Sequence, residues 1–320
     1  MTKLSTKPPR TGSSSRGDGP FRLIILLLAL CIVAVFLLSM WELASSSVAS
    51  IREFGLGFLT RVTWDPVQRS FGALNFIVGT LLTSFMALAI SVPLALAGAL
   101  FVTEYAPKWI AEPVSYLVEL LAAIPSVIYG LWAVFVLVPI IRSIQLWIFY
   151  QPWIMQNPAL KWLVPSAPTG FGLMTAALIL SVMVIPYTAA VARDVIRLVP
   201  QDQREAMYAL GATKWEVIRN AVLPYARAGI FGGVILALGR ALGETMAVTM
   251  VIGNTAKLPT NIWDSTATMA SVIANEFTEA VEDLHLSSLI EIGLLLFILS
   301  VIVNYLARII IARLTPGGVR

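Results

Sequence analysis

An arginine and a glutamate lie four residues apart within a long apolar stretch. Arg240 and Glu244 are the only charged residues between Arg227 and Lys257. A guanidinium presents its N–H groups as a planar fork that binds a tetrahedral oxyanion through two hydrogen bonds. On a helix the two side chains would lie one turn apart and could form an ion pair. The pair is either a self-neutralising structural pair or part of a path for an anion, and we favour the anion path.

The composition places this pair inside a membrane. Of the 320 residues 58% are apolar and 12% are charged, about half the charged share of a soluble domain. No charged residue occurs between Arg69 and Glu104, and about 20 apolar residues suffice to cross a bilayer. These features exclude a soluble globular protein, a disordered chain and a nucleic-acid-binding domain, so no nucleic acid partner is expected. The one cysteine, Cys31, also excludes a domain held by internal disulfides.

The sequence predicts an all-α integral membrane protein with six transmembrane helices. The predicted spans are 22–44, 72–102, 115–141, 170–192, 228–253 and 287–311. Arg240 then lies roughly 18 Å into the fifth span, near the middle of the bilayer, where a charge costs on the order of 2.5–3.5 kcal/mol. A signal peptide is rejected for the first span because its apolar region is too long.

The distribution of basic residues predicts the orientation of the chain. Fifteen of the 22 lysines and arginines lie on the side of the two termini, six lie on the opposite side, and Arg240 lies within a span. The positive-inside rule then predicts that both termini lie in the cytoplasm. The spans themselves are expected to contact membrane lipid. The expected divisions are a disordered cytoplasmic tail at 1–21, a first transmembrane helix at 22–44, an external loop at 45–70, a transmembrane domain at 71–313 and a cytoplasmic tail at 314–320.

The 193–227 loop is the most informative segment outside the predicted spans. Residues 204–212 are predicted to form a helix that ends at Gly211, a usual C-terminal stop. A second amphipathic stretch begins near Trp215 and is expected to stop near Pro224. Two short helices joined by a tight glycine turn would form a rigid projection, which transmits a displacement that a flexible linker would absorb.

This loop resembles the EAA loop of ABC importer permeases. The matching residues are Glu205, Ala206, Gly211, Leu223 and Pro224. Met207 and Ala221 depart from the usual pattern, in which alanine and isoleucine are common at these places. The resemblance implies the type I ABC importer permease (MetI-like) fold. It also implies that the loop is a coupling segment that docks into a groove of an ATPase subunit.

Three further motifs narrow the resemblance. They read AAIPSVIYGLW at 122–132, LGRALGETMAV at 238–248 and ANEF at 274–277. They resemble the PstC family, the C-type permease subunits of bacterial phosphate-specific ABC importers, over about 71–313. The resemblance implies ATP-driven import of inorganic phosphate across the bacterial cell (inner) membrane. It also implies that Arg240 and Glu244 serve phosphate transport.

The same resemblance implies the partners of the chain. They are a second permease subunit (PstA-like), an ATPase dimer (PstB-like) and an external phosphate-binding protein (PstS-like). ATP and Mg²⁺ would be used by the ATPase, because the chain has no Gly-Lys dipeptide and so no Walker A loop. We expect no cofactor, no metal and no catalytic residue in this chain. The alternatives are a permease for sulfate or molybdate, an ion-coupled secondary transporter, for which an EAA loop has no purpose, and a membrane enzyme.

Proline and glycine positions bear on how the helices move and pack. Pro125 and Ser126 are candidates for a helix break or a gating element, although a simple proline kink would explain them equally well. Gly229 with Gly233, and Gly239 with Gly243, have the spacing of small residues at close helix–helix contacts.

Overall fold

The computed structural model describes residues 18–157 and 164–314, and every regular element in these ranges is a helix. The predicted tail residues 1–17 and 315–320 lie outside the described ranges. Six helical segments are long and apolar enough to cross a membrane: Gly19–Ser46, Leu74–Tyr105, Ser126–Phe149, Leu173–Arg197, Lys214–Leu242 and Asp283–Ile310. The predicted fold class and the predicted number of spans are therefore confirmed. The division into domains stays a prediction.

The chain divides into two compact units, Met1–Ser45 and Ser46–Arg320. Helix α1 (Asp18–Ser46) makes up the described part of the first unit. Its large apolar side chains are exposed along its length, from Phe21 to Trp41. A helix that is apolar on all sides is suited to contact with lipid.

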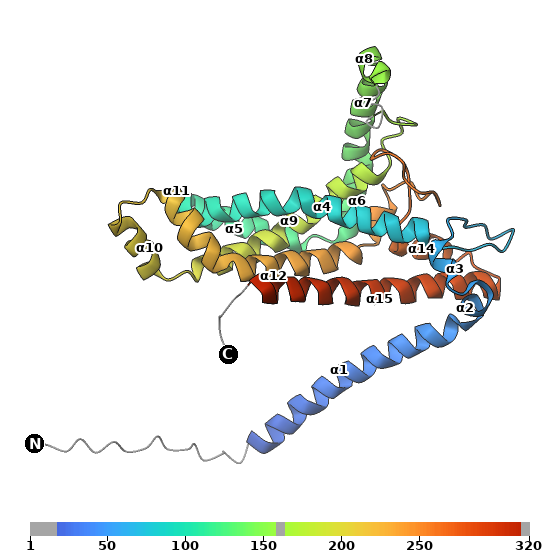
Figure 1. The fold of residues 1–320 in the computed structure, drawn as a ribbon, viewed down its shortest axis with the longest axis horizontal. Coiled ribbons are helices and arrows are strands. Elements are labelled where there is room, and N and C mark those ends of the chain that lie inside the picture. The colour runs from blue at the N-terminus through green and yellow to red at the C-terminus, as the bar shows by residue number, and fades with distance from the viewer. Residues whose placement is uncertain (1–17, 158–163, 315–320) are drawn as a thin grey trace, which may run out of the picture. The chain divides into compact units, whose positions relative to one another are not determined.

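The second unit is a helical bundle centred on α9 (Figure 1). Its long helices are α4 (Leu74–Leu100), α9 (Leu173–Arg197), α12 (Leu223–Leu242) and α15 (Asp283–Leu314). Helix α9 packs against α4 and α12. Its buried residues include several alanines, such as Ala176 and Ala192. Small side chains let the neighbouring backbones approach closely, as is usual where helices associate in a membrane.

The first glycine pair lies at one of these close contacts. A Cβ added at Gly229 would lie 2.5 Å from a methyl group of Val195, and one at Gly233 would lie 2.9 Å from a methyl group of Val191. The packing prediction is confirmed for this pair. At Gly239 and Gly243 an added Cβ would meet only atoms of this chain 3.7 Å or more away, so close packing at this pair stays a prediction.

The predicted third span, 115–141, is two separate segments. Helix α5 (Lys108–Ala123) ends before Ile124, and α6 (Ser126–Trp132) continues through η2 (Ala133–Leu137) into α7 (Val138–Phe149). The chain leaves the helix at Ile124, whose ψ is 129°. Pro125 has no N–H and favours an extended conformation for the residue before it. The predicted boundaries are therefore wrong, whereas a gating role for Pro125 and Ser126 stays a prediction.

The predicted fifth span, 228–253, differs from the structure at both ends. Helix α11 (Lys214–Val217) runs through the π-helical turn η4 (Ile218–Val222) directly into α12, so the chain does not stop at Pro224. Pro224 lies in the first turn of α12, directly after η4, and has no N–H to donate to the preceding turn. At the other end α12 stops at Leu242, and a short helix, α13 (Met246–Thr249), follows.

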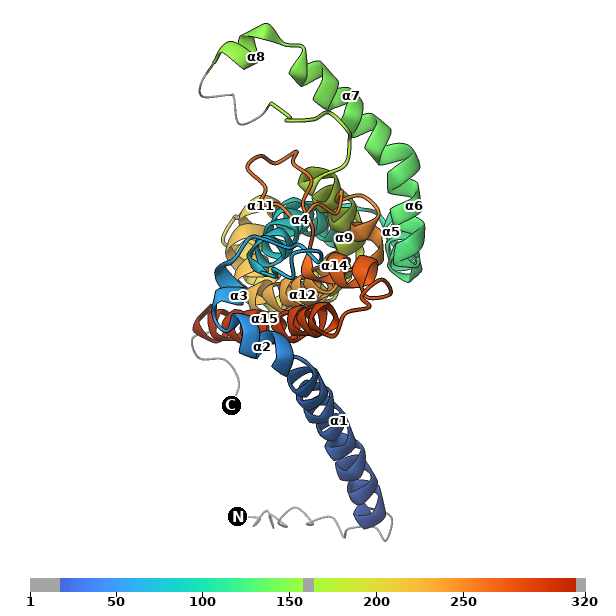
Figure 2. The same ribbon diagram turned by 90° about the vertical axis from the view of Figure 1, so that its right-hand side faces the viewer.

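The shorter elements lie at the two ends of the bundle, except α8, which lies at the far end of α7 (Figure 1). They are α2 (Val48–Phe54), α3 (Gly57–Thr60), η1 (Phe101–Tyr105), α8 (Pro152–Gln156), α10 (Gln201–Ala209) and α14 (Met269–Glu276). Helices α10 and α11 lie at one end, and α2, α3 and α14 lie at the opposite end. Figure 2 shows α6 and α7 as one curved rod that leads away from the bundle to α8.

Candidate functional site

Arg240 lies in the last turn of α12 rather than in the middle of a helix. The carbonyl groups at a helix C-terminus carry partial negative charge, which favours a cation in this turn. The guanidinium also lies over the ring of Tyr187 on α9, with Cζ 4.5 Å from the ring centroid. A cation over an aromatic face is stabilised by about 0.5–2 kcal/mol. These two contacts explain how the positive charge is accommodated within a transmembrane segment.

The expected ion pair between Arg240 and Glu244 is absent among the contacts of these two described residues. The i,i+4 spacing requires an uninterrupted helix, and α12 ends at Leu242. Gly243 leaves the helical path with ψ near 0°. Glu244 therefore lies in the short connection to α13, and the prediction of a pair one helical turn apart was wrong.

One donor of Arg240 has no partner. The Nε atom is fully buried and makes no hydrogen bond within the described structure. Glu244 is also largely buried, with 9% of its surface exposed. A buried donor on a charge that no carboxylate neutralises is costly unless a ligand takes it up. The arrangement is suited to an anion that enters beside Arg240.

Two interrupted helices meet next to this position. Helix α13 packs against α6, where a Cβ added at Gly130 would lie 2.6 Å from Sδ of Met250 and 3.1 Å from Cα of Ala247. The glycine lets the backbones approach closely. Irregular backbone within a membrane is tolerated where it is buried in protein or lines a polar cavity.

The second group of predicted site residues lies at one end of the bundle. Helix α10 ends at Ala209, and Gly211 takes a φ of +82°, a conformation that favours glycine. Helix α11 then begins with a capping box, in which Thr213 N donates to Glu216 Oε2 at 2.7 Å and Glu216 N donates to Thr213 Oγ1 at 3.4 Å. The segment is thus two short helices joined by a defined turn, which we call the α10–α11 knob (Gln201–Val217).

The knob is fastened to the bundle by an ion pair that the sequence did not reveal. Arg204 Nη1 lies 2.6 Å from Glu104 Oε1 in η1, and Arg204 Nη2 donates to the carbonyl of Ile196 at the end of α9. Met207, which departs from the EAA pattern, packs against a small core at this end that includes Val217. Glu104 is far from Arg204 in the sequence, so no spacing rule could have joined them.

The matching residues of the loop divide into an exposed group and a group at the start of α12. Glu205 and Ala206 are exposed on α10, whereas Leu223 and Pro224 belong to the long helix. Large apolar side chains also reach the surface of the knob. They are Tyr208, Leu210 and Trp215, with exposed fractions of 49%, 83% and 57%. Tyr208 and Leu210, beside the polar residues of α10, were the sequence signal for this surface.

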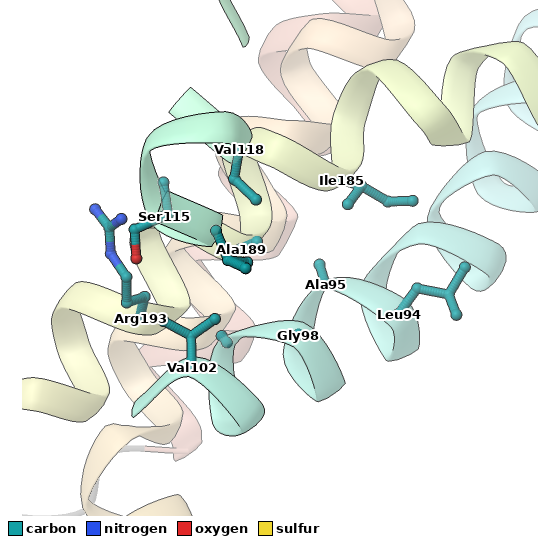
Figure 3. A pocket seen from close by; sticks show the side chains of 12 residues that line it. Leu94, Ala95, Gly98, Val102, Ser115, Val118, Ile185, Ala189 and Arg193 are labelled. Carbon is teal, nitrogen blue, oxygen red and sulfur yellow. The ribbon is translucent and has the colours of Figure 1, made fainter. Parts of the chain in front are cut away.

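An apolar cavity of about 80 Å³ lies between α4, α5 and α9 (Figure 3). It contains none of the predicted site residues. Arg193 lies at its edge, but the guanidinium is 2.8 Å from Glu119 and 3.1 Å from Asp194. Two carboxylates already balance this charge, so the cavity is not suited to an anion.

Residues 18–157 and 164–314 contain no group of three or more His, Cys, Asp or Glu side chains that could hold a metal ion. His285 lies in the first turn of α15, with Nε2 3.0 Å from Glu276 Oε2. Trp64 Nε1 donates to the same carboxylate oxygen at 2.8 Å.

Comparison with known proteins places these features in a family. Residues 91–316 match the family described as binding-protein-dependent transport system inner membrane component. The phosphate transport system permease protein PstC of Pasteurella multocida is 44% identical over 298 residues, which cover 92% of this chain and 89% of the relative. The protein of the same name from Mesorhizobium japonicum is 45% identical over 277 residues, covering 85% and 83%.

Solved structures are similar in fold at low sequence identity. A chain of a bacterial alginate ABC transporter matches with a TM-score of 0.61 and 17% identity, covering 95% of this chain and 99% of that one. A chain of the inward-facing MetNI methionine ABC transporter matches with a TM-score of 0.58 and 17% identity, covering 79% and 100%. These likenesses concern the arrangement of the helices.

Proposed function

The chain belongs to the binding-protein-dependent transport system inner membrane component family and is a permease subunit of a phosphate ABC importer, and on this basis we propose that Arg240 and Glu244 line its phosphate path. As a transport component it is not an enzyme, and it is a multi-pass membrane protein. The observation that carries the proposal is the buried Nε of Arg240, which has no partner.

The chemistry of the two side chains gives each a role in this path. The guanidinium of Arg240 supplies fixed N–H donors for the oxygens of phosphate, and the absence of an ion pair leaves its charge available. The carboxylate of Glu244, in the connection to α13, repels the anion and so limits tight trapping. Rapid transport requires both attraction on entry and easy release.

The α10–α11 knob is proposed as the docking element for the ATPase. Its exposed residues Tyr208, Leu210 and Trp215 provide apolar area for a protein groove. The defined turn at Gly211 and the ion pair of Arg204 support a rigid transmission of movement to the bundle. ATP and Mg²⁺ are used by that ATPase dimer, and no cofactor is assigned to this chain.

The remaining partners and the orientation follow from the same proposal. A second permease subunit of the PstA type completes the pore, and an external phosphate-binding protein of the PstS type delivers the substrate. The chain lies in the bacterial inner membrane with both termini in the cytoplasm. The bias of lysine and arginine toward the side of the termini supports this orientation.

The test is ATP-driven phosphate uptake by vesicles that contain the copurified complex, normalised to the amount assembled. Arg240→Gln should abolish uptake, and Arg240→Lys should reduce it, because a point charge does not reproduce the planar fork. Replacement of both Arg240 and Glu244 by leucine should leave assembly intact and still abolish uptake. Arg308→Gln, which removes an exposed charge on α15, is the matched control and should transport normally.

Two outcomes would contradict the proposal. Normal uptake by the double leucine variant would make Arg240 and Glu244 a packing detail. Uptake of sulfate or molybdate in preference to phosphate would assign the path to another oxyanion.

A further inference from the structure

The interruption between α5 and α6 leaves two carbonyl groups without their helical donors. In a continuous helix Leu121 O would accept the N–H of residue 125 and Ala122 O the N–H of residue 126. Pro125 has no N–H, and the chain is extended at Ile124. Within a membrane such carbonyls need other donors, because water does not supply them.

Two tyrosine hydroxyls take the place of the missing amides. Tyr129 Oη, from α6, donates to Leu121 O at 2.8 Å. Tyr187 Oη, from α9, donates to Ala122 O at 3.0 Å. The carbonyl of Leu121 also accepts Ile124 N at a longer distance of 3.3 Å. The end of α5 is therefore held by side chains from two other segments.

Tyr187 is the member of this pair that also contacts Arg240. Its hydroxyl binds the end of α5, while its ring lies under the guanidinium at 4.5 Å. One rigid side chain thus joins α9, the interruption between α5 and α6, and the last turn of α12. Tyr129, on α6, forms an equivalent hydroxyl hydrogen bond to the same end of α5.

We propose that Tyr187 is a positioning residue that holds Arg240 for phosphate and connects it to the interruption between α5 and α6. The inference rests on the proposed role of Arg240. The aromatic face keeps the guanidinium in the orientation that leaves Nε free. The hydroxyl makes that orientation depend on where α5 ends, so a movement of α5 relative to α6 changes the presentation of Arg240.

The two parts of the side chain predict separable effects on transport. Removal of the hydroxyl should slow the conformational step and leave substrate binding unchanged. Removal of the ring should also weaken phosphate binding, by about 2- to 30-fold if the aromatic contact is lost. A side chain that served only packing would change the amount of assembled complex and would not separate KM from the maximal rate.

The experiment measures initial rates of phosphate uptake against phosphate concentration in vesicles containing the whole complex, normalised to assembled protein. Tyr187→Phe should lower the maximal rate several-fold with an unchanged KM. Tyr187→Met, which keeps an unbranched apolar side chain but removes the ring, should lower the maximal rate and raise the KM. Tyr129→Phe and Tyr129→Met are the matched controls: both should lower the maximal rate, and neither should raise the KM.

The results separate the proposed role of Tyr187 from the proposed role of Arg240 in the phosphate path. An unchanged maximal rate in Tyr187→Phe overturns the inference, and this variant suffices if Tyr187→Met fails to assemble. Equal KM values for Tyr187→Met and Tyr129→Met overturn the role of the ring. If Arg240→Lys changes transport while the Tyr187 variants behave as the wild type, only this inference fails. If Arg240→Lys and Arg240→Gln leave transport unchanged, the proposed function fails as well.

Discussion

Arg204 on α10 and Glu104 in η1 form an ion pair with 15% and 8% of their side chains exposed, and this pair ties the α10–α11 knob to the end of α4. The knob is also continuous with α12 through η4. A force applied to the knob therefore acts on two long helices of the bundle. The chain also joins the knob to α9 through residues 198–200. The ion pair contacts the end of α4, together with the small core that Val217 shares with Ala99.

Removal of one partner of this pair should destabilise the protein strongly. Arg204→Ala leaves the carboxylate of Glu104 buried without a cation, a change that typically costs about 3–5 kcal/mol. Thermal unfolding of the purified complex should show a lower midpoint. Replacement of both residues by apolar ones, Arg204→Met with Glu104→Leu, should restore most of the stability. A single variant as stable as the wild type would contradict the prediction.

A side chain at Gly211 should disturb the turn of the knob through backbone strain alone. No atom lies within 4 Å of a Cβ built there, but φ is +82°, which costs roughly 1–2 kcal/mol for most residues. Gly211→Val should reach the membrane and lose ATP-driven uptake. Gly211→Asn is the control, since asparagine tolerates this conformation better. Full uptake by Gly211→Val would refute the coupling role of the turn.

The sequence predicted the class of fold well because long apolar runs are a strong local signal. It failed where a helix is interrupted. The spacing of Arg240 and Glu244 suggested one helical turn, yet the end of α12 at Leu242 separates them. The contact of Arg240 with Tyr187 joins α12 to α9 across the bundle. Such contacts depend on how helices distant in the sequence pack, and residue spacing does not encode that.

The close contact between α12 and α9 predicts different outcomes for two neighbouring glycines. A Cβ at Gly229 would lie 2.5 Å from Val195, whereas Gly232 has no atom within 4 Å of that position. Gly229→Val should therefore cost about 1–3 kcal/mol or more through overpacking, whereas Gly232→Ala should be neutral or slightly stabilising. The measurement is the yield of folded protein after extraction and its unfolding midpoint. Equal behaviour of the two variants would contradict the packing.

Asp264 predicts a pH dependence of the loop that follows α13. Partial burial alone would raise the pKa of this carboxyl. Hydrogen bonds donated by Thr260, Ser166 and Asn261 outweigh burial, so the pKa is lowered. Because the native pKa lies below the unfolded value of about 3.9, the stabilisation is present above that pH and is lost as the pH falls through the lower native pKa.

The Asp264→Asn variant isolates this contribution. It should unfold at a lower temperature than the wild type at pH 7, and the difference should shrink as the pH falls below about 3.9. Limited proteolysis of residues 254–268 provides a local readout. A difference that is constant from pH 7 to pH 3 would show that the carboxylate charge plays no part.

The π-helical turn at Ile218–Val222 determines the azimuth of Arg240 about the axis of α12. A π-helical turn holds one residue more than an α-helical turn, and one residue corresponds to about 100° of rotation. Conversion of this turn to α-helical geometry with the same residues would therefore carry the guanidinium away from Tyr187, whereas deletion of a single residue here would let a regular α-helical turn keep the guanidinium in place. The orientation of the Arg240 side chain about the helix axis is thus set close to the knob, at the opposite end of the same continuous helix.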